Sequence, residues 1–252
     1  MIRALLFDFN GILVDDEPLH AELLLRVLRE EGVATLRVDA ERFRGLDDRT
    51  ALSGALRAAG EAAPSGRVAR LVVRKAAYYR ETIRRQGYPY FAGAVALVRE
   101  AAAAGLPLAL VSGALRDEVA SGLEQAGIAR FFKVVVTAED VQRGKPDPQG
   151  YDQALTALNG NPPLPERLIH AHEGVAIEDS SAGLAAAAAC GLRTLAVAPK
   201  GRLAKPPNAE ACVETLNGLR LCDLEAILDR RENQLARREA KVLRSRIARV
   251  EK

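Results

Sequence analysis

Residues 5–16 read Leu5-Leu6-Phe7-Asp8-Phe9-Asn10-Gly11-Ile12-Leu13-Val14-Asp15-Asp16. The apolar run from Ile2 to Phe7 has the length of a buried β-strand, and it ends at the carboxylate of Asp8. Asn10-Gly11 then signals a turn. Because open parallel sheets bind ligands beyond the carboxyl ends of their strands, Asp8 is well placed for chemistry. Taken alone, the stretch is equally consistent with an ordinary turn after an edge strand.

Composition and charge narrow the class of protein. The chain has 252 residues, 48% hydrophobic and 27% charged, which is typical of a soluble globular protein. No apolar run is long enough to span a bilayer and no signal-peptide pattern opens the chain, so we expect a cytoplasmic protein without a membrane partner. The net charge of +3 is too small to indicate a nucleic-acid partner. Cys190, Cys212 and Cys222 lack metal-ligand spacing, so we expect reduced, mostly buried thiols.

An all-helical segment follows the first strand. Apolar residues recur there at helical spacing, and no convincing strand interrupts them between Asp16 and Gln86. Val14 to Asp16 and Gly87 to Tyr90 mark the two ends of the segment, and together they are a candidate two-strand hinge. The expected helices are Pro18–Leu28, Arg49–Ala59 and Ser65–Arg85.

From Gly93 onward the chain alternates between helices and strands. This alternation predicts an α/β fold, in which helices cover both faces of a parallel sheet. The expected strands are Pro107–Val111, Phe132–Val136, Val175–Ile177 and, as the last one, Leu195–Val197. The expected helices are Gly93–Ala104, Leu115–Ala126, Pro148–Leu158 and Ser181–Ala189.

The last part of the chain differs in charge. From Asp229 onward it is rich in Arg and Lys, and a narrow apolar seam recurs at three- and four-residue steps, which predicts a helix. A solvated helix at the terminus is the favoured interpretation, and a helix that binds a partner or an anionic surface is the alternative. We therefore expect a core domain of residues 1–15 and 88–225, a helical domain of residues 16–87, and a basic helix of residues 226–252.

Side chains suited to phosphate chemistry follow four of the expected strands. The loops after parallel strands gather at one edge of the sheet, so we expect these side chains to converge. Carboxylates hold Mg²⁺ through hard oxygen ligands, and a hydroxyl, backbone N–H groups and an ammonium neutralise phosphate oxygens. A carboxylate at Asp8 can attack phosphorus and form an aspartyl-phosphate. The four sites are Asp8, Ser112-Gly113, Lys145-Pro146-Asp147-Pro148 and Glu178-Asp179-Ser180.

With these motifs the chain resembles the haloacid dehalogenase (HAD) superfamily of hydrolases, in the branch with a helical cap after the first strand. That branch includes phosphoglycolate phosphatase, β-phosphoglucomutase and related sugar-phosphate phosphatases. The resemblance covers residues 1 to about 225. It rests on Asp8-Phe9-Asn10-Gly11, Ser112-Gly113, Lys145-Pro146-Asp147-Pro148, Ile177-Glu178-Asp179-Ser180-Ser181-Ala182-Gly183 and, inside the cap, Glu17-Pro18-Leu19-His20 and Gly45-Leu46-Asp47-Asp48-Arg49.

The resemblance implies a Rossmann-like core with a helical cap and a Mg²⁺-dependent phosphatase acting on a small phosphorylated substrate. Asp8 would be the nucleophile and a magnesium ligand. The backbone carbonyl of Asn10 and the carboxylate of Asp179 would complete the protein's share of the coordination, with Glu178 alongside. Ser112, Gly113 and Lys145 would hold the phosphate, and Lys145 would also assist catalysis. We expect a monomer or a weak homodimer.

Two residues depart from the family pattern. The family usually carries an acid–base Asp two residues after the nucleophile, where this chain has Asn10, and a Ser or Thr where this chain has Asp16. An amide cannot exchange a proton near neutral pH, and losing such a group costs a factor of about 10² to 10⁴ in rate. One hypothesis is that Asp15 or Asp16 partly takes over proton transfer; the alternative is that both are loop and helix-capping carboxylates.

These departures keep two further functions open. The protein could be a catalytically impaired member that binds a phosphorylated ligand or partner. It could also be a sugar phosphomutase, although mutases need the missing Asp.

Substrate specificity is expected to come from the cap. His20, Arg49 and Lys75 lie on segments expected to face the mouth of the site, where cationic groups would suit an anionic sugar phosphate or a second acidic group. Arg116, four residues after Ser112, could also reach the substrate. For Arg49 and Lys75, ordinary helix-surface charge is the alternative. Closure of the cap would exclude water from the site.

Overall fold

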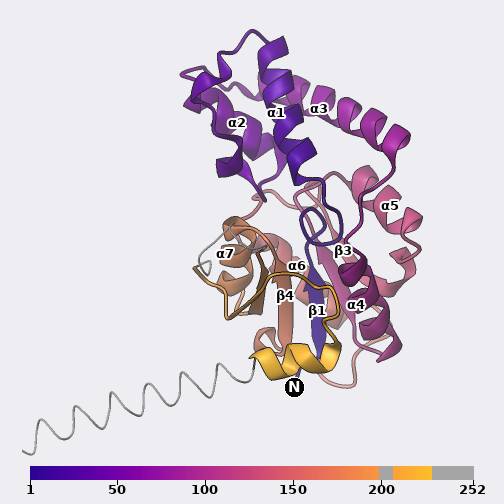
Figure 1. The fold of residues 1–252 in the computed structure, drawn as a ribbon. Coiled ribbons are helices and arrows are strands. Elements are labelled where there is room, and N and C mark those ends of the chain that lie inside the picture. The colour runs from indigo at the N-terminus through magenta and orange to yellow at the C-terminus, as the bar shows by residue number, and fades with distance from the viewer. Residues whose placement is uncertain (199–206, 229–252) are drawn as a thin grey trace, which may run out of the picture.

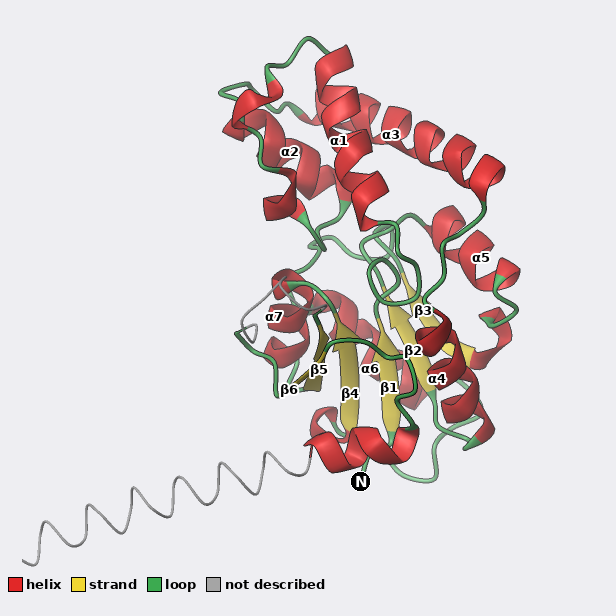
Figure 2. Cartoon of the chain, viewed as in Figure 1, coloured by secondary structure: helices red, strands yellow, loops and turns green. Residues whose placement is uncertain are grey.

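The computed structural model describes residues 1–198 and 207–228 of the chain (Figure 1). Within these residues, six strands form one parallel sheet in the order β3-β2-β1-β4-β5-β6 (Figure 2). The strand β1 lies inside the sheet, because Leu6 pairs with Ala109 of β2 on one side and with Ala176 of β4 on the other. The strands are β1 (Ala4–Phe7), β2 (Leu108–Val111), β3 (Phe132–Val136), β4 (Gly174–Glu178), β5 (Arg193–Val197) and β6 (Ala211–Val213).

Helices cover both faces of this sheet, as the alternation of strands and helices predicted. Successive residues of a strand point to opposite faces. Leu5 and Phe7 accordingly pack with α4 (Ala92–Ala103) and α5 (Arg116–Gln125), whereas Ala4 and Leu6 pack with α6 (Gln149–Gly160) and α7 (Ser181–Ala189). The strands β1 and β2 are buried on both faces along their whole length, which explains why each reads as a continuous apolar run.

Residues 16–87 form what we call the helical block. It contains α1 (Glu17–Glu30), η1 (Thr35–Arg37), η2 (Ala40–Phe43), α2 (Asp48–Ala58) and α3 (Ser65–Gln86). Apolar side chains of α1, α2 and α3, among them Leu28, Leu52 and Leu71, pack into a cluster separate from those of the sheet. Figure 1 shows the block beyond the carboxyl end of β1, at the edge of the sheet where the predicted site lies. That the block is a separate domain stays a prediction.

The chain enters and leaves the helical block through two segments that lie side by side. Val14 and Tyr90 form an isolated antiparallel bridge. The backbone N–H of Asp15 donates a hydrogen bond to the carbonyl of Pro89 at 2.7 Å. These are the two segments that the sequence analysis identified as a candidate hinge.

Two expectations about the C-terminal part were wrong. Leu195–Val197 was expected to be the last strand, but β6 follows it and pairs with β5. With only three residues, β6 is too short for the sequence pattern to reveal. The cysteines were expected to be mostly buried, yet Cys212 and Cys222 are exposed and Cys190 is partly buried. Cys212 is the middle residue of β6, so it faces away from buried Ala211.

The basic helix expected from Asp229 onward lies outside the described residues. Among residues 1–198 and 207–228, no helix has both the length and the apolar character needed to cross a bilayer.

Candidate active site

Three buried carboxylates meet at the carboxyl edge of the sheet. Asp8 directly follows β1, Glu178 ends β4, and Asp179 comes next. Because Phe7 pairs with Ile177 across these neighbouring strands, the three side chains converge. Within the described residues, one oxygen from each lies within 4.8 Å of the others. Such an arrangement of acids is costly without positive charge among them.

The electrostatics of these carboxylates reflect that cost. Burial raises the pKa of Asp8 well above its usual range, the charge of Glu178 raises it further, and the Lys145 ammonium opposes the shift. Burial raises the pKa of Asp179 to about 7, although the Arg44 guanidinium opposes it. Both shifts disfavour the ionised form, so the site favours the binding of additional positive charge.

Lys145 supplies part of this charge. Its Nζ donates a hydrogen bond to Glu178 Oε1 at 2.6 Å and lies 3.0 Å from Asp8 Oδ1. The hydroxyl of Tyr151 also donates to Glu178 Oε1, at 2.6 Å. The charges of Asp8 and Glu178 outweigh burial and raise the pKa of Lys145, so it stays an ammonium. Ser180 Oγ donates to Glu178 Oε2 at 3.3 Å, so Glu178 is held by three donors and serves to orient Lys145.

Ser112 and Gly113 follow β2 beside these carboxylates. The backbone N–H of Ser112 donates to Val136 of β3, and Ser112 Oγ accepts from the N–H of Ala114. Gly113 lines the same pocket as Asp8. A Cβ at Gly113 would come within 3.1 Å of the backbone nitrogen of Asp47, so glycine allows the helical block to approach the core closely here.

The Asn10 side chain lines the pocket above Asp8 and is bonded to Asp16. Its Nδ2 donates to the two carboxylate oxygens of Asp16 at 3.0 and 2.9 Å. The hydroxyl of Tyr79 donates to Asp16 Oδ2 at 2.5 Å, and His20 Nε2 lies 3.5 Å from that oxygen. Asp16 is 1% exposed and its side chain makes no capping hydrogen bond to α1, whereas Asp15 is exposed.

These contacts decide the ionisation of Asp16. Burial alone raises its pKa, but hydrogen bonds from His20, Tyr79 and Asn10 and the charge of His20 together bring it below the usual value. Burial and Lys75 lower the pKa of His20, but the hydrogen bond to Asp16 and its charge outweigh them and raise it. Asp16 is therefore a carboxylate at neutral pH.

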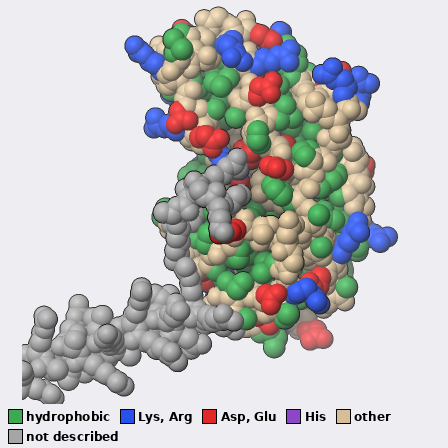
Figure 3. Space-filling view, viewed as in Figure 1, with side chains coloured by type: hydrophobic (Ala, Val, Ile, Leu, Met, Phe, Trp, Pro, Cys, Tyr) green, Lys and Arg blue, Asp and Glu red, His purple; other side chains and the backbone are tan. Residues whose placement is uncertain are grey.

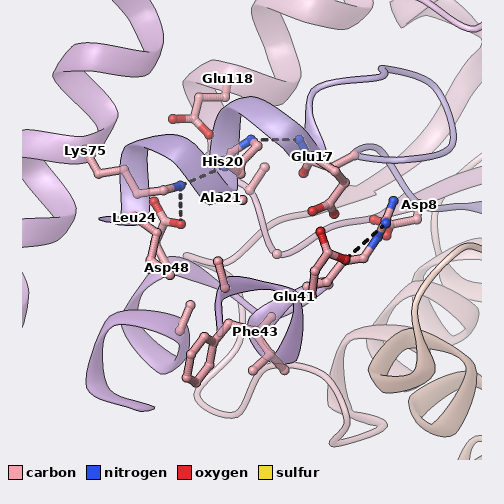
Figure 4. A pocket seen from close by; sticks show the side chains of 18 residues that line it. Asp8, Glu17, His20, Ala21, Leu24, Glu41, Phe43, Asp48, Lys75 and Glu118 are labelled. Atoms are coloured by element: carbon pink, nitrogen blue, oxygen red, sulfur yellow. Dashed lines mark hydrogen bonds and ion pairs between the residues drawn. The ribbon is translucent and has the colours of Figure 1, made fainter. Parts of the chain in front are cut away.

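Two of the four residues expected to contact substrate line the pocket above Asp8. His20 and Lys75 both lie in its wall (Figure 4). Lys75 is buried, and its Nζ lies 2.6 Å from Asp48 Oδ1 and 2.7 Å from His20 Nδ1. The helix-surface alternative for Lys75 is therefore wrong.

The other two residues lie elsewhere. Arg49 is exposed on α2 and lines a neighbouring groove with Gly113 and Lys145. Arg116 is exposed at the start of α5, where it forms an ion pair with Asp140. The described structure does not bring either residue into the wall of the pocket above Asp8.

Sequence reasoning missed several residues of the site, among them Arg44 and Glu118. Arg44 donates from Nε and Nη2 to Asp179 Oδ2 at 3.0 and 2.7 Å, and it directly precedes the cap motif that begins at Gly45. Glu118 lies in the pocket wall, 4% exposed, and burial raises its pKa to about 7. A signal for Glu118 was available, because helical spacing puts it on the buried face of α5 with Val119 and Gly122.

Comparison with known proteins adds a family and several relatives. The family model described as haloacid dehalogenase-like hydrolase matches residues 5–197. Validoxylamine A 7'-phosphate phosphatase of Streptomyces hygroscopicus subsp. limoneus is 29% identical over 76% of this chain and 84% of its own length. Hexitol phosphatase A of Escherichia coli K12 is 29% identical over 77% of this chain and 82% of its own.

Solved structures agree on the architecture. CbbY from Rhodobacter sphaeroides, in complex with phosphate, superposes with a TM-score of 0.74 at 25% identity and covers 89% of this chain and 100% of its own. β-Phosphoglucomutase from Clostridium difficile gives a TM-score of 0.76 at 20% identity, with 91% and 98% covered, and supports the fold alone.

Proposed function

Because this chain belongs to the haloacid dehalogenase-like hydrolases, we propose that it is a Mg²⁺-dependent phosphatase that cleaves a small phosphate monoester, such as a sugar phosphate, through an aspartyl-phosphate on Asp8. The observation that carries the proposal is the convergence of Asp8, Lys145, Glu178 and Asp179 at one edge of the sheet. Two relatives are a hexitol phosphatase and a validoxylamine A 7'-phosphate phosphatase, which supports a small phosphorylated substrate.

The residues present fit a divalent cation. Their oxygens are hard ligands of the kind that Mg²⁺ prefers. Among the described residues, Asp179 Oδ1 is a buried oxygen without a hydrogen-bond partner, as expected for a ligand position. Asp8, Asp179 and the backbone carbonyl of Asn10 would hold the cation, and Glu178 would stay paired with Lys145. When bound, the cation would supply charge stabilisation for the transferring phosphoryl group.

The chain's own residues account for the two steps. Asp8 attacks phosphorus as the bond between phosphorus and the ester oxygen breaks, which leaves an aspartyl-phosphate and an alcohol. Ser112, the N–H groups around Gly113, and Lys145 bind the phosphoryl oxygens. Water then attacks the aspartyl-phosphate, which releases phosphate and restores Asp8.

The departing alcohol needs a proton that the Asn10 amide cannot supply, so we expect slow turnover. The hypothesis that Asp16 compensates gains support from its contact with Asn10, but its lowered pKa makes it a poor proton donor. Asp16 therefore suits the second step, as a base toward water, better than the first. Asp15, which is exposed, gains no such support.

Substrate entry requires the helical block to move. The pocket above Asp8 has a volume of about 60 Å³, well below the roughly 300–1,000 Å³ of ordinary ligand sites. The segments around Val14 and Tyr90 are the two covalent links between block and core, so we propose that the hinge lies there.

The test is to incubate the protein with a panel of phosphate esters and to measure phosphate release and covalent phosphoprotein, with Mg²⁺ and with EDTA. Release over many turnovers, abolished by EDTA and by Asp8→Asn, supports the proposal. Stoichiometric labelling without release identifies a stalled nucleophile. If Asp8→Asn leaves release and labelling unchanged, Asp8 is not the nucleophile. Arg130→Gln, a change at an exposed residue of η3, is a control for charge.

A further inference from the structure

The cations in the wall of the pocket above Asp8 are already bonded to carboxylates. Lys75 Nζ donates to Asp48 Oδ1 at 2.6 Å and also contacts His20 (Figure 4). His20 in turn lies against Asp16, which holds the opposite side of its ring. Neither Lys75 nor His20 therefore presents an uncompensated positive charge to a substrate.

Arg44 is compensated in the same way. It makes two hydrogen bonds to Asp179 and lies 3.7 Å from Glu41. If a divalent cation replaces the guanidinium at Asp179, Arg44 still has Glu41 beside it. This wall therefore offers no free cation to a second anionic group, among the residues that the structure describes.

Two acids in the same wall, among the described residues, have no cationic side chain bonded to them. For the described part of the chain, neither the Glu17 nor the Glu118 carboxylate forms an ion pair or bonds to another side chain, and Glu118 has the backbone N–H of Leu115 as a donor. Figure 4 shows both, with His20 drawn between them. Burial raises the pKa of each, to about 7 for Glu118. Buried carboxylates in proteins are normally paired with a cation or several donors, so two carboxylates in a pocket without a side-chain partner call for a ligand that donates to them.

On the premise that the protein is the phosphatase described above, we infer that Glu118 and Glu17 bind the leaving group of the substrate, and that this group carries hydroxyls or an ammonium rather than a second phosphate or carboxylate. Hydroxyl and ammonium groups donate hydrogen bonds to carboxylates, whereas a second anion would meet two acids and no free cation. On the face drawn in Figure 3, acidic side chains also gather where the helical block meets the core.

This inference changes the expectation drawn from the sequence. His20 and Lys75 suggested a substrate with a second acidic group, because their charges were counted without their partners. The structure shows that Asp48 and Asp16 neutralise them. The acids that remain, Glu17 and Glu118, favour a leaving group that is neutral or positively charged over one that is negatively charged.

The experiment compares three esters of similar size: glucosamine 6-phosphate, glucose 6-phosphate and 6-phosphogluconate. Binding of each is measured by calorimetry to the Asp8→Asn protein with Mg²⁺, so that affinity is obtained without turnover. The same measurement is repeated with Glu118→Gln added. Glu124→Gln is the matched control, because Glu124 lies on the same helix and is exposed. Hydrolysis of p-nitrophenyl phosphate by the unmodified protein tests the phosphatase activity separately.

We expect the ammonium and neutral esters to bind at least about ten-fold more tightly than the carboxylate ester. They can donate a hydrogen bond to the Glu17 or Glu118 carboxylate, and one hydrogen bond to a charged group is worth about that factor. Glu118→Gln should reduce the preference for the ammonium ester by about ten-fold, and Glu124→Gln should not change it. Tightest binding of 6-phosphogluconate, an unchanged preference in Glu118→Gln, or no binding of any ester overturns the inference. Absence of p-nitrophenyl phosphate hydrolysis, with the predicted order of binding intact, overturns the proposed function instead.

Discussion

Replacing Asn10 with aspartate should expose how strongly positions 10 and 16 depend on each other. The Asn10 nitrogen that lies 2.9 to 3.0 Å from the two oxygens of Asp16 would become a carboxylate oxygen. Two unit charges about 4 Å apart repel by about 4 kcal/mol at an effective dielectric constant of about 20. Since one carboxyl can keep a proton instead, we expect Asn10→Asp to lose about 2 to 4 kcal/mol of unfolding free energy near neutral pH.

The loss should shrink in mild acid. Repulsion raises the pKa of one carboxyl in the folded Asn10→Asp protein above its value in the unfolded chain. The penalty is therefore present above the raised pKa and is relieved as the pH falls through it. The measurement is urea unfolding of the unmodified protein, Asn10→Asp, Asp16→Thr and the double variant at neutral and mildly acidic pH.

Phosphatase activity should follow the same coupling. A working general acid is worth a factor of about 10² to 10⁴, but beside Asp16 we expect the single Asn10→Asp change to deliver less than about ten-fold. The double variant Asn10→Asp/Asp16→Thr should deliver more, because the repulsion is gone. Asp15→Asn, at an exposed neighbour, is the control.

Two results would refute this reasoning. One is an Asn10→Asp protein as stable as the unmodified one at neutral pH. The other is additivity: the changes in unfolding free energy caused by Asn10→Asp and by Asp16→Thr sum to the change in the double variant within about 0.5 kcal/mol. Separately, no gain of activity in Asn10→Asp together with no loss in Asp16→Asn would end the hypothesis that Asp16 compensates for the missing acid.

Three further predictions follow from the same geometry. Arg44→Gln should tighten Mg²⁺ binding by at least about ten-fold, since a competing charged donor leaves Asp179; calorimetry without substrate measures this, and unchanged or weaker binding contradicts it. Gly11→Ala should weaken Mg²⁺ binding, because the added Cβ would come 2.1 Å from Asp179 Oδ2. The control is Gly105→Ala, which has the same φ of 75° but no atom within 4 Å of the added Cβ, so it should lose stability only. Equal Mg²⁺ affinities of the two variants would contradict the clash. The stability that Asp16 contributes should be present above its pKa in the unfolded chain and lost as the pH falls through its lowered pKa in the folded protein. Urea unfolding of the unmodified protein and of Asp16→Asn should therefore show a difference in unfolding free energy that shrinks in acid. A difference independent of pH would be the contrary result.

The sequence located most of the core of the site because parallel strands end at one edge. Asp8 and Asp179 directly follow neighbouring strands, so apolar runs ending in acids were enough to place them together. Lys145 is placed in the same way, by the loop after β3. The α/β sheet with helices on both faces was predicted from alternation and is confirmed.

What the sequence could not supply are contacts between elements that no periodic pattern links. Arg44 meets Asp179 only because the helical block docks on the core, and the two residues are 135 positions apart. The partners of Lys75 likewise depend on how α1, α2 and α3 pack. The sequence shows which side chains are charged, but it does not show which of these charges an opposite charge neutralises. For His20 and Lys75 this difference changes the leaving group that we expect.

The position of β1 also bears on how the chain acquires its structure during synthesis. Leu5 of β1 pairs with Leu108 and Val175, which are made long after it. The whole helical block emerges from the ribosome after β1 and before either partner. Each doubling of a closed loop adds only about 0.6 kcal/mol of chain entropy, so an insertion of this size is thermodynamically cheap. The cost is kinetic: until β2 and β4 are made, the apolar strand β1 has no strand to pair with and stays open to aggregation.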